Sequence, residues 1–282
     1  MSIYPSENER GEGKLVLKKS LAKRLEQSEI DCLNARLTAI QQIDGNPMRV
    51  EIQQFGQATA FSVKNIPGPA FNTVKGLQSG DEPYIEQILD FYKQKEIPVR
   101  FELTPAASPE LLTTLHQAGF YHHDFHTTLY APLSKINRID TANPSELSIR
   151  ELEREEFDTF ADIYVKGFQM PDFLKNGVAQ NNEVLYGHAQ WRFYLASFAN
   201  EPAGIAVLFM KNAMASLAAA ATIPSFRNKG IQSALIKQRL QEAILHDCEL
   251  IVGQAKFGSV SQNNMERAGL QVAYTKAIWI NR

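Results

Sequence analysis

Residues 222–234 read TIPSFRNKGIQSA, and this stretch decides the fold. An apolar strand runs into Pro224, a basic turn follows from Arg227 to Gly230, and an amphipathic helix begins directly after the turn. The first N–H groups of a helix have no partner within the helix, and the helix dipole adds about half a positive charge there. Glycine lets the backbone come close to a ligand. The stretch therefore predicts a site for a phosphate or a diphosphate.

The chain nearly repeats itself around this stretch, at an offset of 150 residues. LHQAGF at 115–120 matches MERAGL at 265–270, and Gly80 falls on Gly230. The other matched segments are 81–95 with 231–245, 99–105 with 249–255, and 121–131 with 271–281. Because the type and order of the elements agree without a gap, we interpret the chain as two related halves.

The repeat supplies an internal control for the phosphate site. The matching loop of the first half keeps Gly80 but has no Arg or Lys, and Asp81 and Glu82 follow it; the aligned residues are Leu77, Gln78, Ser79, Gly80, Asp81 and Glu82. Carboxylates suit the N-terminus of an empty helix and repel a diphosphate. We expect the first half to be structural or to form a wall of the substrate site.

Hydrophobic periodicity predicts an alternation of helices and strands. We expect helices at 15–43, 81–96, 108–118, 154–168, 231–246 and 260–268. We expect strands at 47–53, 57–64, 99–104, 123–132, 147–152, 191–198, 203–210, 213–222, 249–255 and 271–281. A turn is expected at 65–68, and 170–190 is interpreted as a polar loop with room for one helical piece.

These elements divide the chain into four parts. Residues 1–44 are interpreted as a tail and a helix packed on the first domain, 45–133 as that domain, 134–146 as a linker with Asn143-Pro144, and 147–282 as the second domain.

The second part resembles the GNAT acetyltransferases. Its order of elements is similar to theirs, and the loop 227–233 resembles the acyl-coenzyme A loop of the family, Arg/Gln-x-x-Gly-x-Gly/Ala. Arg227 and Gly230 match, and Gln232 takes the place of the last small residue. The resemblance implies an α/β fold with a mixed sheet and two GNAT-like halves. The second half is the complete acyl-CoA N-acyltransferase fold, and the first is a degenerate relative.

The resemblance also implies acetyl-CoA as co-substrate, with its pantetheine arm along the end of strand 214–222. A backbone N–H near Ala221 would polarise the thioester carbonyl. Expected contacts to the coenzyme are Ala221, Thr222, Ile223, Arg227, Asn228, Lys229, Gly230, Ile231, Gln232, Ser233 and, on the later helix, Asn264. The alanines at 218–221 either leave room for the thioester or simply pack tightly.

Catalytic groups are harder to assign. Many members of the family carry a Glu on the strand at 214–222 and a Tyr on the second coenzyme-binding helix, but here the strand has no Glu and Met265 stands at the Tyr position. Tyr274 is the nearest substitute acid, and His188 and Glu183 are candidate bases. The alternative for each is an ordinary packed or solvated side chain. A thiol pKa near 8.5 makes an acid helpful rather than essential, and a base is not needed if the amine arrives neutral.

Composition excludes other classes of function. The net charge of −2, from 29 basic and 31 acidic side chains, argues against nucleic-acid binding. The two cysteines, Cys32 and Cys248, indicate neither a disulfide framework nor a zinc site. His122 and His126 share a strand face with Asp124 while His123 points away, and we expect no metal. With no signal sequence or membrane span recognised, we expect a cytoplasmic protein.

The sequence thus predicts an N-acetyltransferase that transfers an acetyl group directly to an amine of a small molecule or peptide, with both substrates bound together. Two alternatives stay open: a non-catalytic module that binds or senses acyl-CoA, and an acyltransferase whose donor is longer than acetyl. The acceptor and the oligomeric state are not specified by the sequence.

Overall fold

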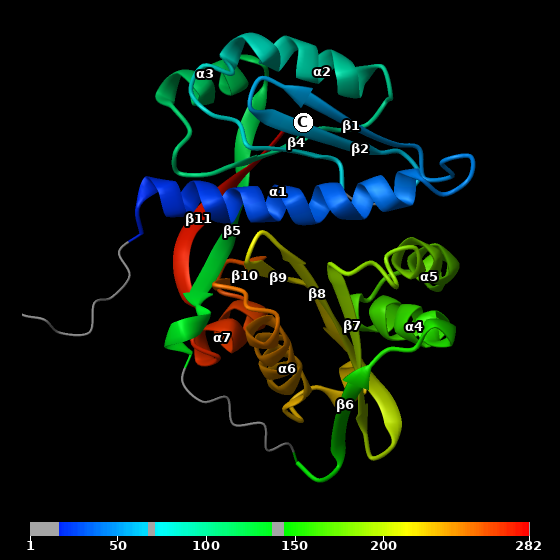
Figure 1. Cartoon of the computed structure of the whole chain (residues 1–282). Coiled ribbons are helices and arrows are strands. Elements are labelled where there is room, and N and C mark those ends of the chain that lie inside the picture. The colour runs from blue at the N-terminus through cyan, green and yellow to red at the C-terminus, as the bar shows by residue number, and fades with distance from the viewer. Residues whose placement is uncertain (1–16, 67–70, 137–143, 282) are drawn as a thin grey trace, which may run out of the picture.

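The computed structural model describes residues 17–66, 71–136 and 144–281, and within them eleven strands form one mixed sheet (Figure 1). The strand order is β1-β2-β3-β4-β11-β5-β10-β9-β8-β7-β6. The strands are β1 Val50–Phe55, β2 Ala58–Val63, β3 Thr73–Lys75, β4 Arg100–Leu103, β5 Phe120–Pro132, β6 Leu147–Glu151, β7 Trp191–Phe198, β8 Glu201–Lys211, β9 Met214–Thr222, β10 Leu250–Lys256 and β11 Gln271–Asn281.

Helices cover both faces of this sheet. They are α1 Lys19–Gln41, α2 Ile85–Lys93, α3 Pro109–Gln117, α4 Phe157–Phe168, α5 Lys175–Glu183, α6 Ile231–Leu245 and α7 Val260–Arg267. Short 3₁₀ turns precede α2, α4 and α5 and follow β5 and β9. None of the helices in the described ranges combines the length and apolar character that crossing a bilayer requires.

Most of the predicted elements are present, with ends that differ by a few residues. The strand β3 was not predicted, because three residues are too few for a pattern. Helix α5 occupies much of the segment 170–190, which was interpreted as mainly loop. The tail 1–16, part of the turn at 65–68 and the middle of the linker 134–146 lie outside the described residues.

The two halves exchange their last strands. Strand β5 ends the first half, yet its neighbours β10 and β11 both belong to the second half. Strand β11 ends the second half, yet its neighbours β4 and β5 both belong to the first (Figure 1, green and red). The repeat in the sequence did not predict this exchange. The domain boundaries at 45–133 and 147–282 stay a prediction.

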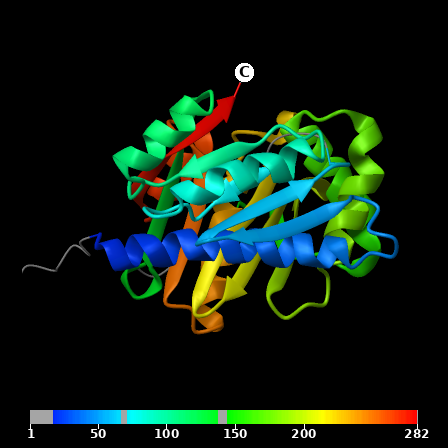
Figure 2. The ribbon, with the colours of Figure 1, turned by 90° about the horizontal axis from the view of Figure 1, so that it is seen from above.

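Side-chain alternation along the strands assigns the helices to faces. On β8, Ile205 and Val207 pack with α4, whereas Ala206 and Leu208 pack with α6. On β2, Ala60 packs with α2 and α3, whereas Phe61 packs with α1. Helix α1 crosses strands of both halves on one face (Figure 2), between α2 and α3 above it and α6 and α7 below it in Figure 1.

A gap between β9 and β10 positions the site. These parallel strands pair only between Met214–Ser216 and Leu250–Val252. Beyond Ser216, β9 continues along β8, with a bulge at Ala218 between the pairs Leu208 with Leu217 and Val207 with Ala219. The separation leaves backbone groups of β9 without a strand partner on the β10 side, with α1 and α4 on one face of the gap and α6 and α7 on the other.

Candidate functional site

A cavity of about 490 Å³ lies at this gap and is lined from both faces of the sheet. From the α6 and α7 face it is lined by Gln232, Ile236, Arg239, Ser261 and Met265. From the opposite face it is lined by residues of α1, α4, β3, β4 and β5. Residues 216–220 of β9 and 252–256 of β10 form its edges between the faces. Because both faces contribute, a ligand on the α6 side can meet a second ligand on the α1 side between the separated strands.

The glycine turn before α6 lies at the α6 side of this cavity. Gly230 is the N-cap of α6 in the left-handed conformation, with φ 80°, and no side chain caps the helix. A Cβ placed on Gly230 would meet nothing within 4 Å. Gln232, two residues further on, lines the cavity. An uncapped helix N-terminus with open space in front of it fits a diphosphate.

The two cations of the turn contact the protein itself. Arg227 Nη2 donates to the carbonyl oxygen of Gly167, near the end of α4, at 2.9 Å. Lys229 Nζ lies 4.3 Å from the ring centroid of Phe198 and 5.2 Å from that of Phe226. These contacts fix the turn against its neighbours. The backbone N–H groups of the turn are therefore its main donors toward a phosphate.

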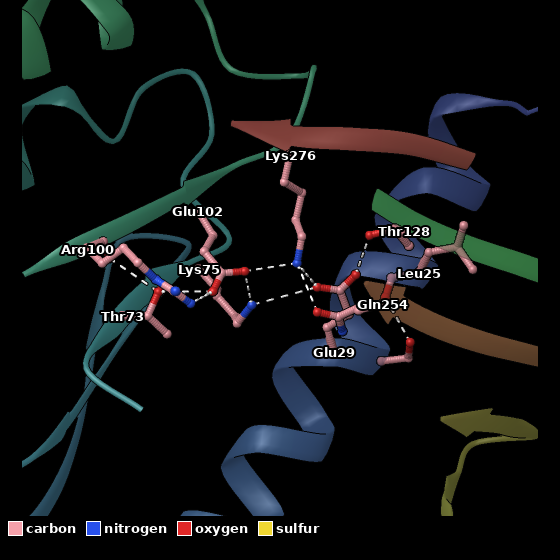
Figure 3. Close-up of polar contacts among 10 residues, drawn as sticks. Leu25, Glu29, Thr73, Lys75, Arg100, Glu102, Thr128, Gln254 and Lys276 are labelled. Carbon is pink, nitrogen blue, oxygen red and sulfur yellow. Dashed lines mark hydrogen bonds and ion pairs between the residues drawn. The ribbon is translucent and has the colours of Figure 1, made fainter. Parts of the chain in front are cut away.

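On the α1 face, the cavity lining includes four charged side chains that form a group with Lys276, which does not itself line the cavity. We call these five residues the inner charged cluster: Glu29, Lys75, Arg100, Glu102 and Lys276 (Figure 3). Lys276 Nζ lies 2.5 Å from Glu29 Oε2 and 2.9 Å from Glu102 Oε2. Lys75 and Arg100 also contact Glu102, and Lys75 Nζ is 3.7 Å from Glu29 Oε2.

Polar neighbours complete the hydrogen bonds of this cluster. Thr128 Oγ1 donates to Glu29 Oε1 at 2.7 Å, and Lys276 Nζ donates to Gln254 Oε1 at 3.1 Å. Burial alone would raise the pKa of Glu102, but Lys276, Lys75 and Arg100 outweigh it and hold this pKa well below its usual value. Glu102 is therefore a buried anion with three cations around it.

The geometry can be compared with known proteins. Residues 148–266 match the family model described as acetyltransferase (GNAT) family. The GNAT domain that this match shows spans residues 148–266 of the chain. No curated protein matches the chain at a significant level.

Solved structures resemble the whole chain. A GCN5-related N-acetyltransferase from Kribbella flavida has a TM-score of 0.63 at 13% identity, covering 93% of this chain and 95% of its own. A tandem GNAT protein from the clavulanic acid biosynthesis pathway has a TM-score of 0.63 at 11% identity, covering 92% and 94%. A conserved protein of unknown function from Staphylococcus epidermidis reaches 0.61 at 12% identity, covering 86% and 98%. At such identities the likeness shows the fold alone, and it confirms the predicted fold class.

Within the GNAT domain, the coenzyme residues predicted at the turn lie together, but the others are dispersed. Ala221 packs in the cluster beneath α4, and Thr222 Oγ1 is buried without a hydrogen-bond partner. Asn264 Oδ1 accepts from Arg267 and does not line the cavity, whereas Ser261 and Met265 on the same helix do. The lining segment of β9 is 216–220, which ends directly beside Ala221, and the backbone N–H expected near Ala221 stays a prediction. The alanines were expected either to leave room for the thioester or to pack tightly. Ala218, Ala219 and Ala220 line the cavity.

The three predicted catalytic residues do not line the cavity between β9 and β10. Tyr274 is buried with Leu25 and Tyr130, and burial raises the pKa of its hydroxyl. Glu183, at the end of α5, lies 3.5 Å from Arg154 Nε. His188 is exposed in the turn before β7. Their catalytic roles stay predictions that the geometry does not support.

Two features were missed by the sequence reasoning. The first is the inner charged cluster, although Lys276 stands between Tyr274 and Ile278 on the buried face of β11, which is a visible signal. The second is His126, considered only as a metal ligand, which lines the cavity. Burial lowers the pKa of this imidazole below its ordinary value, so the ring is neutral near pH 7. Within the described residues no group of three or more His, Cys, Asp or Glu is placed to hold a metal ion.

Proposed function

We propose that the protein transfers an acetyl group from acetyl-CoA to an amine, with both substrates bound in the cavity between β9 and β10. The main support is that this cavity is lined from both faces of the sheet and has the open glycine turn of α6 on one face. A donor held on the α6 face then meets an acceptor held on the α1 face. Such proximity supplies much of the rate acceleration of a two-substrate reaction.

The donor site is assigned to the turn and to β9. Backbone N–H groups of residues 228–233 would hold the diphosphate. Backbone groups of β9 that have no strand partner on the β10 side beyond Ser216 would hold the pantetheine arm. The small side chains of Ala218 to Ala220 line the cavity and leave room for the thioester. A backbone N–H of this segment would stabilise the negative charge that develops on the carbonyl oxygen.

Transfer of the acetyl group to an amine requires one proton acceptor. The amine nitrogen attacks the carbonyl carbon that the donor supplies, the C–N bond forms, the C–S bond breaks, and the thiolate leaves. The nitrogen loses a proton in this step. His126 is the imidazole that lines the cavity, and its lowered pKa keeps it able to take up that proton. We assign this role to His126 in place of His188 and Glu183.

The test uses two glycines that the repeat matches. Gly230→Glu projects a carboxylate into the open space where the diphosphate would lie, while Gly80→Glu does the same at the equivalent turn of the first half. Both glycines have positive φ, 80° and 97°, and neither Cβ position has an atom within 4 Å, so the backbone strain is similar. Since each charge-assisted hydrogen bond contributes about 1.5–3 kcal/mol, Gly230→Glu should weaken CoA binding by about 100-fold or more.

Calorimetric titration with CoA measures this difference. Gly80→Glu should bind CoA like the unmodified protein. Unchanged affinity in Gly230→Glu, or an equal loss in both variants, contradicts the donor site.

A second function, an acyl-CoA sensor without turnover, is favoured by the positions of Tyr274, His188 and Glu183 outside the cavity. Thiol release measured with acyl-CoA esters of increasing chain length and a panel of amines separates the alternatives. Tight CoA binding without thiol release supports the sensor, and release that increases with chain length supports a longer donor.

A further inference from the structure

The α1 side of the cavity carries more positive than negative charge. Among the described lining residues of that side, Arg36, Lys75, Arg100 and Lys256 are cationic, and Glu29 and Glu102 are anionic. Lys256 Nζ is neutralised by Asp124 Oδ2 at 2.9 Å. Lys75, together with Lys276, shares the carboxylates of Glu29 and Glu102. The positive charges of these two lysines equal the negative charges of these two glutamates. The positive charges of Arg36 and Arg100 therefore remain in excess.

Arg100 shares its carboxylate with two other cations. Its Nη2 contacts Glu102 Oε1, while Lys75 and Lys276 both contact Oε2 of the same group. The side chain of Arg100 is 13% exposed, and its Nε is buried without a hydrogen-bond partner. A buried donor without a partner is costly, and it shows that the hydrogen bonds of Arg100 within the protein are incomplete.

Arg36 has no carboxylate within ion-pair distance among the residues that the structure describes. Its Nη1 donates to the amide oxygen of Asn182 at 2.8 Å, and its guanidinium carbon lies 5.1 Å from the ring centroid of Trp191. These contacts hold the guanidinium at the cavity without neutralising it. Arg36 is partly buried, so part of its hydration is lost without a compensating carboxylate, and an anionic ligand would supply that compensation.

We propose that Arg36 and Arg100 bind the carboxylate of the acceptor, which is therefore an α-amino acid or a similar small amine that bears a carboxylate. The inference rests on the proposed function and names the acceptor class. Guanidinium groups match the planar carboxylate with two parallel hydrogen bonds. Glu29 and Glu102 are already engaged by lysines, so this wall repels a polyamine. A cavity of about 490 Å³ has the size of a small-molecule site.

The first experiment compares matched acceptors with the full-length protein. Each common amino acid is paired with its carboxamide, and spermidine and O-phosphoethanolamine are further arms. Binding to the protein saturated with CoA is measured by calorimetry, and turnover with acetyl-CoA by thiol release. Since one charge-assisted pair is worth about 1.5–3 kcal/mol, at least one acid should exceed its amide about tenfold or more in affinity or kcat/KM.

Each other outcome overturns the proposal. These outcomes are an amide equal to its acid, a preference for spermidine, no acid bound by the CoA-loaded protein, and acceptance of O-phosphoethanolamine without any carboxylate. The last would indicate a phosphate subsite instead.

The second experiment tests whether Arg36 and Arg100 bind the carboxylate of the acceptor. Arg36→Gln and Arg100→Gln should each raise KM for the preferred acid, or its Kd on the CoA-loaded protein, by about tenfold or more, and leave the values for the amide unchanged. Lys256→Gln is the control, because it removes a lining cation that Asp124 already neutralises. Arg36 lies outside the inner charged cluster, so Arg36→Gln remains informative if Arg100→Gln fails to fold.

CoA affinity separates this proposal from the previous one. If both Arg variants bind CoA normally but keep the preference for the acid, the acceptor assignment fails and the proposed function stands. If the unmodified protein does not bind CoA, both fail.

Discussion

Glu26 is a buried carboxyl group on α1 without a cation in ion-pair contact among the described residues. It is 8% exposed. Burial, with a further contribution from Glu29, raises its pKa from 4.5 to about 7, although Lys276 and Lys75 partly oppose the shift. Glu26 therefore takes up a proton in the folded protein at a pH at which the unfolded chain has released it.

The sign of the resulting pH dependence follows from this order of pKa values. Between pH 4.5 and about 7 the folded state binds more protons, so stability falls as the pH rises through this range. At pH 8 the folded protein must hold Glu26 ionised in a buried position, which costs free energy. Glu26→Gln removes this cost and should raise the free energy of unfolding at pH 8 by about 3 kcal/mol. Most of this gain should disappear at pH 5. Urea unfolding at both pH values measures this gain, and Glu86→Gln on the exposed face of α2 is the control. A gain that is equal at both pH values contradicts the raised pKa of Glu26.

Among the elements, β5 and β11 have the most unusual surroundings, because each lies between two strands of the other half. An isolated first half would leave β5 without either neighbour, and an isolated second half would do the same to β11. Unpaired strand edges favour aggregation over folding. We therefore expect fragments 1–140 and 141–282 to lack native structure alone and to regain it, with CoA binding, when mixed.

Amide chemical-shift dispersion and circular dichroism of the separate and mixed fragments test this expectation. Two fragments that each unfold cooperatively on their own would contradict it. A full-length chain nicked by a protease within 137–143 is the control, because every strand is still present.

The elements could be predicted from the sequence, but their partners could not. Helical and strand periods are local, and the two glycines that the repeat matches, Gly80 and Gly230, both have positive φ in the structure. Which strand lies beside β11 depends on pairing over more than a hundred residues, and no local pattern specifies it. Lys276 shows the same limit: its burial could be predicted from its neighbours, but its partners Glu29 and Glu102 are far away in the sequence.

At the scale of the whole molecule, the inner charged cluster joins the halves, since Lys276 comes from the second half and Glu29, Lys75, Arg100 and Glu102 from the first. Lys276→Met removes the cation that contacts the buried carboxylates of Glu29 and Glu102. It should lower the free energy of unfolding by about 3–5 kcal/mol. Lys256→Met, which breaks the partly exposed pair with Asp124, should cost about 1 kcal/mol or less.

Calorimetric unfolding of these two variants provides the measurement. One cooperative transition at a lower temperature is expected for Lys276→Met. Equal effects of the two substitutions, or separate transitions for the two halves, would show that the cluster does not couple them.

The exchange of β5 and β11 also has a consequence for synthesis of the protein. A chain leaves the ribosome N-terminus first, and domains usually fold in that order. Here β5 emerges well before β10 and β11, the two strands that flank it. The early half must wait, with its sheet unfinished, until both of these strands have been translated. A message truncated before residue 271 therefore yields no usable first half, only a nascent product for chaperones and proteases.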